Sequence, residues 1–379
     1  MSKVRNFIIL VIIIMALWHL YGETFNQSGL QGVKEDFLTD VDEIRENPIV
    51  IETVDTISTG VQLLIGKISE NIQDEDEQIQ PNIPAPDKPN LQAPSVQSFS
   101  IHNIEIGDTK EEVESQVGSA NRESLNEYGV MWHAYHENYH NFFMVAYDEH
   151  NRVVGLYTNQ DLLSTTIDLS FNDTRDTVLS TLGEPLSGIR KGLINYKIQS
   201  HNEYDTFSLD DSYVTIFYDK HENNTITAVE LISEELEKKK EAFFGIPSPE
   251  LREGLEYQLF DLTNASRVIH GLPVLNWDES VRNTARNHSI DMAENNYFSH
   301  TNPLGQSPFD RMEEDQIVFR TAGENLAAGQ SSSIFAHEGL MNSKGHRDNI
   351  LNPAFEALAV GVAFNEDNQP YYTENFLAK

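Results

Sequence analysis

Three short motifs in the last third of the chain carry the side chains best suited to chemistry. They are Phe-Ser-His at 298–300, Gly-Glu-Asn at 323–325 and Gly-His-Arg at 345–347. Two imidazoles and a carboxylate from three separate segments are what a polar cleft, or a three-ligand metal site with an open position, requires. His300, Glu324 and His346 are therefore the predicted cleft or catalytic residues, and His300 and His346 are the predicted ligands if a metal binds.

Taken together, the three motifs resemble those of the CAP superfamily (cysteine-rich secretory, antigen 5 and pathogenesis-related 1 proteins) in its bacterial, cysteine-free branch. The resemblance covers about residues 250–379 and includes the residues that flank each motif. It implies a three-layer α-β-α sandwich of the SCP/PR1-like type, with a polar cleft over the central sheet. It also implies a cleft of two His and two Glu, of which His300, Glu324 and His346 match three.

The fourth cleft residue has no match by motif. Eukaryotic members carry a Glu shortly after a Trp, whereas this chain has Leu340 and Ser343 in the corresponding stretch. Glu338 is close in sequence, and it either reaches the cleft or points elsewhere from its helix. The sequence therefore supports three cleft residues rather than a full tetrad.

Hydrophobic periodicity predicts the elements that position these residues. The apolar residues between 255 and 269 recur on one face of a helix. A second helix follows Asp278, and its apolar stripe includes His288, which we interpret as a buried histidine with a hydrogen-bond partner. Residues 359–364 and 370–376 predict two paired strands joined by a turn.

An internal repeat is predicted within residues 99–234. Each copy starts with an Asp-Thr pair that offers a helix cap, at 108–109 and at 173–174, and continues with a short amphipathic helix closed by glycine. Each copy then runs into a strand hairpin. The predicted domain is α+β, a tandem helix-plus-antiparallel-sheet module, and it resembles the CAP-associated domain of Bacillus-type membrane-anchored proteins.

Histidines and aromatic residues cluster in the first copy. They are Trp132, His133, Tyr135, His136, Tyr139 and His140. One interpretation is a ligand or metal surface. The other, which we favour because the second copy has no matching histidines, is a half-buried strand or hairpin with histidines on its solvent face.

The N-terminal part of the chain predicts export and attachment. Lys3 and Arg5 precede an apolar run at 7–20, so residues 1–22 are a predicted signal anchor or, alternatively, a cleaved signal peptide. Residues 23–98 then predict a spacer, because an acidic run and spaced prolines cannot bury a core. The chain would continue through a linker at 235–250 into the CAP-like domain at 251–379.

Composition limits the partners and the chemistry. The chain has 379 residues and a formal charge of −34, which argues against nucleic acid as a partner. Cysteine is absent, which excludes disulfides, thiolate catalysis and cysteine-based zinc sites. The predicted partners are the membrane, through the N-terminal helix, and a cell-wall or lipid ligand.

Two functions remain open from the sequence. The first is an extracytoplasmic, membrane-anchored binding module whose cleft takes a small ligand, a glycan or lipid, or a divalent cation such as zinc or calcium. The alternative is a metal-dependent, peptidase-like hydrolase that uses His300, Glu324 and His346. No Gly-x-Ser-x-Gly or His-Glu-x-x-His motif is present. The first interpretation is preferred; a role at the envelope of a spore-forming bacterium follows by analogy alone.

Overall fold

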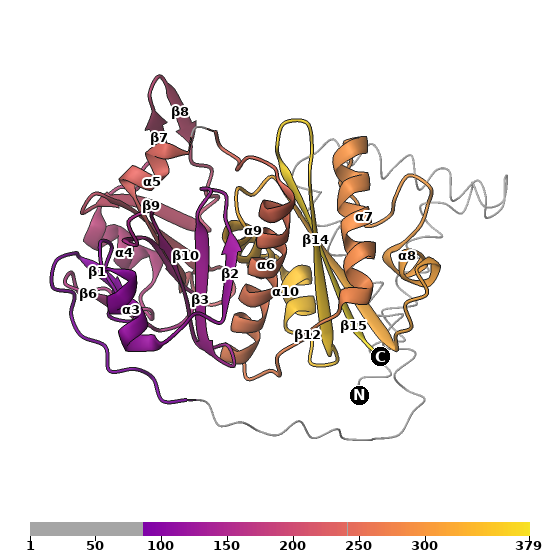
Figure 1. Ribbon diagram of the computed structural model, residues 1–379, viewed down its shortest axis with the longest axis horizontal. Coiled ribbons are helices and arrows are strands. Elements are labelled where there is room, and N and C mark those ends of the chain that lie inside the picture. The colour runs from indigo at the N-terminus through magenta and orange to yellow at the C-terminus, as the bar shows by residue number, and fades with distance from the viewer. Residues whose placement is uncertain (1–85, 241) are drawn as a thin grey trace, which may run out of the picture. The chain divides into compact units, whose positions relative to one another are not determined.

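The computed structural model describes residues 86–240 and 242–379 (Figure 1). The chain divides into two units, residues 1–74 and 75–379, and the described residues belong to the second. The predicted signal anchor and most of the predicted spacer lie outside the described residues. Within the described ranges, no helix is both long enough and apolar enough to cross a membrane.

The first half of the second unit is built on one antiparallel sheet. Its strands, in spatial order, are β2 (Arg122–Leu125), β3 (Met131–Glu137), β4 (His140–Tyr147), β5 (Val153–Thr158), β11 (Thr225–Ser233), β10 (Ser212–Asp219) and β9 (Tyr204–Leu209). Strands from the two predicted copies therefore join in a single sheet, because β5 pairs with β11. A separate hairpin, β7 (Gly188–Lys191) with β8 (Ile194–Lys197), projects from this half (Figure 1).

Two short helices, α3 (Lys110–Val117) and α4 (Arg175–Leu182), pack on one face of this sheet together with the strand pair β1 (Phe99–Ile101) and β6 (Leu163–Thr165). Thr109 caps α3 in a capping box with Glu112, whereas Thr174 at the N-cap of α4 makes no side-chain cap bond. Both helices end at a glycine with positive φ, as predicted, and each buries one valine completely.

The second half contains the remaining elements. They are α5 (Glu234–Lys239), α6 (Pro249–Ile269), β12 (Asn276–Trp277), α7 (Glu279–Asn295), α8 (Pro308–Glu314), β13 (Thr321–Ala328), α9 (Ser333–Asn342), α10 (Lys344–Ile350), β14 (Ala357–Phe364) and β15 (Pro370–Ala378). Four strands form a sheet in the order β12-β14-β15-β13. The predicted strand pair is present, with Phe364 opposite Pro370 across the turn.

This second sheet lies between two helical layers. Along β14, Leu358, Val360 and Val362 join the core formed with α6, α9 and α10. The alternate residues face α7, and a Cβ added at Gly361 would lie 2.1 Å from the backbone nitrogen of Arg286. Glycine is required there because the helix backbone comes so close to the strand.

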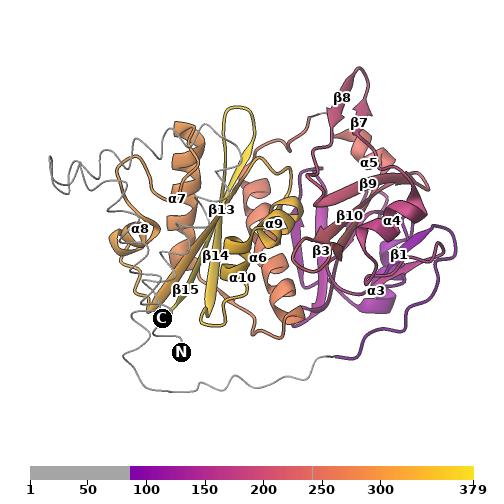
Figure 2. The same ribbon diagram turned by 180° about the vertical axis from the view of Figure 1, so that it is seen from behind.

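One hydrophobic cluster contains residues from both halves. The second face of the seven-stranded sheet, with Trp132 and Tyr157, packs against Leu262 of α6 and Ile334 of α9. Figure 2 shows α6 and α9 between the two sheets. At this junction Arg122 Nε donates to Asp261 at 2.9 Å. Residues 235–250, predicted as a linker, include α5, whose Leu236 is buried in the same core.

Candidate functional site

Glu324 is the centre of the candidate site. It lies on β13 opposite Asn375 of β15, and its side chain is 1% exposed. His300 Nδ1 donates to its Oε1 at 2.9 Å, and Arg311 Nη2 donates to its Oε2 at 2.7 Å. Both carboxylate oxygens are therefore held. In the neutral form of His300, with the donated proton on Nδ1, Nε2 is left as a hydrogen-bond acceptor.

Arg311 ties the loop of the first motif to the sheet. It lies on α8, whose start is fixed by Pro308 and by a capping box between Ser307 and Asp310. Its Nη1 donates to the backbone oxygens of His300 at 2.8 Å and of Gln306 at 3.0 Å. The sequence analysis did not identify Arg311. A single arginine in the first helix after the Phe-Ser-His motif was the available signal.

The local charges keep Glu324 ionised. Burial alone would raise the pKa of its carboxyl, but the His300 hydrogen bond and the Arg311 guanidinium outweigh that effect and lower the pKa below its ordinary value. A buried carboxylate with two charge-assisted partners is a fixed structural anion. It orients His300 rather than exchanging protons itself.

His346 lies in the N-terminal turn of α10. Asn325, next to Glu324 on β13, donates to the backbone oxygen of His346 at 3.2 Å and to Glu374 at 3.0 Å. Asn349 in turn donates to Asn325 at 2.9 Å and to the backbone oxygen of Glu324 at 3.2 Å. The Asn side chains therefore connect the second and third motifs and fix the turn that carries His346.

The imidazole of His346 is neutral at physiological pH. Burial lowers its pKa to about 4, and the nearby positive charge of His300 adds to the effect. The backbone oxygen of His346 accepts from Asn325, the neighbour of Glu324 on β13. The structure thus places His300 in direct contact with Glu324 and positions His346 beside the same strand.

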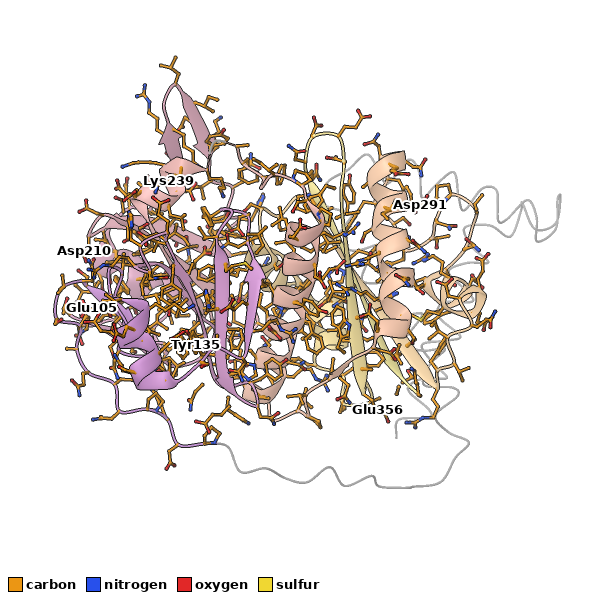
Figure 3. The ribbon with its side chains drawn as sticks, viewed as in Figure 1. Glu105, Tyr135, Asp210, Lys239, Asp291 and Glu356 are labelled. Atoms are coloured by element: carbon orange, nitrogen blue, oxygen red, sulfur yellow. The ribbon has the colours of Figure 1, made fainter. Side chains whose placement is uncertain are left out.

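His288 is a buried histidine with a hydrogen-bond partner, as predicted. Its Nε2 lies 3.0 Å from the backbone oxygen of Ser299, and 3.9 Å from Glu324 Oε1. The sequence did not indicate that this residue would also lie against the Glu324 network. It packs edge-on to Tyr297, whose hydroxyl donates to Asp291. Figure 3 labels Asp291 on α7.

A cavity of about 550 Å³ adjoins this network on the side of α7 and α8. His288 and Arg311 belong to its wall, so they link it to Glu324. The rest of the wall is mostly amide, hydroxyl and carboxylate groups, from Thr284, Asn287, Asp291, Asn295, Asn302, Gln306, Glu314 and Asp315. Pro303 and Leu304 complete the wall, which therefore combines many hydrogen-bonding groups with apolar surface.

Glu338 does not join the cleft. It is buried on α9, where Tyr157 of the first half donates its hydroxyl to Glu338 Oε1 at 2.8 Å. Burial raises the pKa of Glu338 to about 8. The side chain therefore points from its helix toward the other sheet, which was the second of the two predicted possibilities.

The histidine and aromatic cluster of β3 and β4 is mainly structural. Trp132 is fully buried, and His136 stacks on Tyr139 with ring centroids 4.1 Å apart. Tyr139 donates its hydroxyl to Asp261 at 2.9 Å, so the cluster braces the junction between the halves. His133 of β3 is buried rather than on a solvent face, which differs from the expected placement, and its ring lies edge-on to Tyr147 with centroids 4.9 Å apart.

Glu324 is not placed as a third ligand of the predicted metal site, because both of its oxygens have protein partners. Across the described ranges, no three His, Asp or Glu side chains are grouped so as to hold a metal ion. Glu324 is engaged by Arg311 and His300, so it stands behind His300 as an orienting carboxylate. Nε2 of His300 and the ring of His346 are the groups that would hold a cation, and imidazoles suit zinc better than calcium.

The α-β-α sandwich and its Glu-His-Arg network define a CAP domain. Residues 260–376 match the cysteine-rich secretory protein family, CAP, and residues 106–243 match the CAP-associated N-terminal family. The chain therefore contains a CAP domain preceded by a CAP-associated N-terminal domain.

Two Bacillus subtilis strain 168 proteins are similar to it. The membrane protein YlbC is 28% identical over 292 residues, which is 72% of this chain and 82% of YlbC. YkwD is 42% identical over 124 residues, which is 33% of this chain and 47% of YkwD. The first similarity spans both domains, whereas the second spans about half of that relative.

Two solved structures resemble the fold. An extracellular protein containing an SCP domain from Bacillus anthracis has a TM-score of 0.63 and 28% identity, covering 77% of this chain and 99% of that chain. A cysteine-rich secretory protein from Staphylococcus aureus has a TM-score of 0.59 and 14% identity, covering 76% and 95%. The second shows similarity of fold alone.

Proposed function

We propose that this chain is an extracytoplasmic, membrane-anchored CAP-domain protein that acts as a cell-surface binding module. Its binding site would be the cleft of His300, Glu324 and His346. The observation that carries this proposal is the engagement of both Glu324 oxygens by fixed cationic or polar partners. The arrangement holds a site in shape and leaves acceptor nitrogens for a ligand.

The same observation disfavours the hydrolase alternative. A general base must reach the proton that it abstracts, and its pKa should lie near the working pH. Glu324 has no oxygen without a donor, and its pKa is lowered. Taking up a proton would require loss of the Arg311 contact. A binding role needs no such rearrangement.

A hydrogen-bonding ligand such as a cell-wall glycan suits the site best. Nε2 of His300 and the neutral ring of His346 can accept hydrogen bonds from hydroxyl or amide groups. The adjoining cavity adds amides and carboxylates, which are the usual partners of sugar hydroxyls. A zinc ion held by the two imidazoles is the other occupant that the donor set allows.

Attachment outside the cell membrane rests on the N-terminal sequence and on the relatives. Lys3 and Arg5 precede the apolar run, and the similar proteins are described as a membrane protein and an extracellular protein. Protease treatment of intact cells should degrade the domain, and deletion of residues 1–22 should abolish export. A protease-protected domain in intact cells, digested only after lysis, would refute the proposed location.

We propose that residues 99–234 contain an internal repeat that arose by duplication. The matching Asp-Thr starts and glycine ends of α3 and α4 support it. A duplicated unit would explain why one sheet contains two similar hairpins.

Calorimetric titration of the full-length protein with a soluble disaccharide-peptide fragment of the cell wall tests the binding function. We expect binding in the wild type and at least about a tenfold loss in His346→Ala and in His300→Ala. His150→Ala is the matched control, because this histidine is exposed on a turn of the other domain. Zinc and calcium are titrated in parallel to identify a cation site.

The same samples test the alternative. Chromatography of the fragment after incubation should show no cleavage. Cleavage that is lost in Glu324→Gln would establish the hydrolase instead. Absence of fragment, zinc and calcium binding in the wild type would refute the binding module.

A further inference from the structure

A second cavity, of about 610 Å³, lies where the two domains meet. Its floor is the second face of the first sheet, from β9, β10 and β11, and its far wall is the segment from Ala328 to Ser331 with α9. The β7–β8 hairpin and the stretch after α5 complete the rim. This cavity contains none of His300, Glu324 and His346, so it is separate from the cleft.

Hydrogen-bond acceptors converge on this cavity without enough donors. Glu230 of β11 is 2% exposed, and its Oε1 has no hydrogen-bond partner among the described residues. Gln330 also lines the cavity, and its buried Oε1 has no hydrogen-bond partner among the described residues. Glu338 adds a third acceptor, with one oxygen bonded to Tyr157. A buried acceptor without a donor is costly, and a ligand that supplies one removes the cost.

Two of the three lysines in the cavity wall are engaged elsewhere, and Lys197 is the third. Lys191 Nζ lies 2.5 Å from Glu237 and donates to the backbone oxygen of Lys240 at 2.8 Å. Lys240 Nζ lies over the ring of Tyr128, 4.2 Å from its centroid. Neither lysine makes a hydrogen bond to Glu230. Burial raises the pKa of Glu230 well above its ordinary value, Glu127 and Glu237 add to the rise, and Lys240 opposes it. The empty site therefore favours the protonated carboxyl, and a cation bound beside Glu230 would favour the carboxylate.

Aromatic and aliphatic side chains line the rest of the cavity. Phe335 packs edge-on against Tyr204 and Phe217, each with centroids 5.1 Å apart, and Ile232 lies on the floor beside them. Aromatic faces attract organic cations, and apolar walls take the carbon skeleton that carries the charge. The wall therefore fits a ligand with a charged donor group on an apolar body.

We propose that this interdomain cavity binds an organic cation, an ammonium or guanidinium group carried on an apolar or aromatic body, with Glu230 and Glu338 as its acceptors. A basic peptide side chain has this chemistry. The ligand would contact both domains at once, since Glu230 belongs to the first and Glu338 to the second. This binding site is independent of the His300 cleft and of the function proposed for it.

A pair of peptides that differ in one group tests the proposal directly. Acetyl-Lys-Phe-amide carries the ammonium group, and acetyl-norleucine-Phe-amide replaces it with a methyl group. Calorimetric titration into the full-length protein should give at least about tenfold tighter binding of the lysine peptide. Glu230→Gln and Glu338→Gln should each remove most of that preference while binding of the norleucine peptide stays the same.

Glu324→Gln is the control for location, because it changes the cleft and not this cavity. It should bind the lysine peptide as the wild type does. Circular dichroism of each variant establishes that it is folded, and two separate Gln variants protect the test if one fails to fold. Equal affinity for both peptides, no measurable binding of the lysine peptide, or loss of preference only in Glu324→Gln would each overturn the proposal.

Discussion

At the scale of single residues, Arg311 determines the state of the candidate cleft. It holds one oxygen of Glu324 and two backbone oxygens of the loop that carries His300. Without it, a buried carboxylate would keep one partner and the loop would lose two hydrogen bonds. The three motifs alone therefore do not specify the cleft, because its geometry also depends on Arg311, which lies outside all of them.

Arg311→Met should destabilise the protein by about 3 kcal/mol, because it leaves the Glu324 carboxylate buried and half-paired. Adding Glu324→Gln should restore much of the loss, since the charge that needed Arg311 is then gone. Urea unfolding followed by tryptophan fluorescence measures both changes. Arg320→Met is the control, because this side chain is 68% exposed and its pair with Glu356 contributes less than about 1 kcal/mol. Equal effects at the two arginines would contradict the assigned role.

His346 should remain neutral from pH 8 down to about pH 5. Its pKa of about 4 results first from burial and then from the charge of His300. Titration of the imidazole signals by nuclear magnetic resonance measures the midpoint. His300→Ala should raise the midpoint toward the ordinary value by removing the second contribution. A wild-type midpoint near 6.5 would contradict the lowered pKa that partial burial gives His346.

The sequence predicted the motif residues of this site but not their partners. His300, Glu324 and His346 stand in short segments that resemble a known family. Arg311 and Asn349 act through contacts made 13 and 24 or 25 residues away in the chain, and no local pattern specifies those contacts. The sequence left open where the Glu338 side chain points, because a position on a helix gives that direction only when the elements packed around the helix are known.

At the scale of elements, helix α6 is the part that both domains depend on. One side of it packs on β14, and another side meets β2 so closely that a Cβ added at Gly254 would lie 2.1 Å from the backbone oxygen of Leu125. Gln258 donates to the same oxygen at 2.9 Å. The glycine and the amide together let a helix approach a strand backbone.

Gly254→Ala should therefore destabilise the protein by at least about 2 kcal/mol, although alanine is the better helix former. Gly339→Ala is the matched control: it lies within α9, and a Cβ there meets nothing within 4 Å. That change should be neutral or stabilise by up to about 1 kcal/mol. Thermal unfolding of both variants gives the comparison, and a stabilising Gly254→Ala would show that β2 yields to the helix.

Element type was predicted better than element pairing. Caps, glycines and alternating apolar residues identified α3, α4 and the hairpins, because each signal lies within a few residues. Pairing of β5 with β11 joins segments about 70 residues apart, and nothing in either strand specifies its partner. The location of α5 in the shared core was missed for the same reason: a short charged helix reads as a linker unless its contacts are known.

At the scale of the whole molecule, buried ionisable groups act in opposite directions on stability. Burial lowers the pKa of His136 and His346 to about 4, so between pH 4 and 6.5 their proton is held by the unfolded chain and stability rises with pH. Burial raises the pKa of Glu374 to about 7 and of Glu338 to about 8. Their proton is held by the folded chain, so stability falls as pH rises from 4.5 to those values.

Below pH 6.5 the histidines and the carboxyl groups both change the free energy of unfolding with pH. Above pH 6.5 only the carboxyl groups still do. The free energy of unfolding should therefore fall between pH 6.5 and 8, with Glu338 alone contributing on the order of 2 kcal/mol. Urea unfolding at intervals across this range measures the slope. Glu338→Gln should flatten it, and Glu222→Gln, an exposed control, should not. A stability that rises across this interval would contradict the burial of these acids.

The polar contacts across α6 also constrain how such a chain can change over generations. Asp261 is buried between Arg122 and Tyr139 of the other domain, and its pKa of about 6 reflects that burial. A recombination that gave this CAP domain a different upstream domain would leave that carboxylate without Arg122 and Tyr139. Lineages that keep the CAP half alone should therefore have replaced Asp261, and should be free to carry larger residues at the position of Gly254. A recombination boundary that preserves these contacts therefore lies upstream of both sheets, not between them.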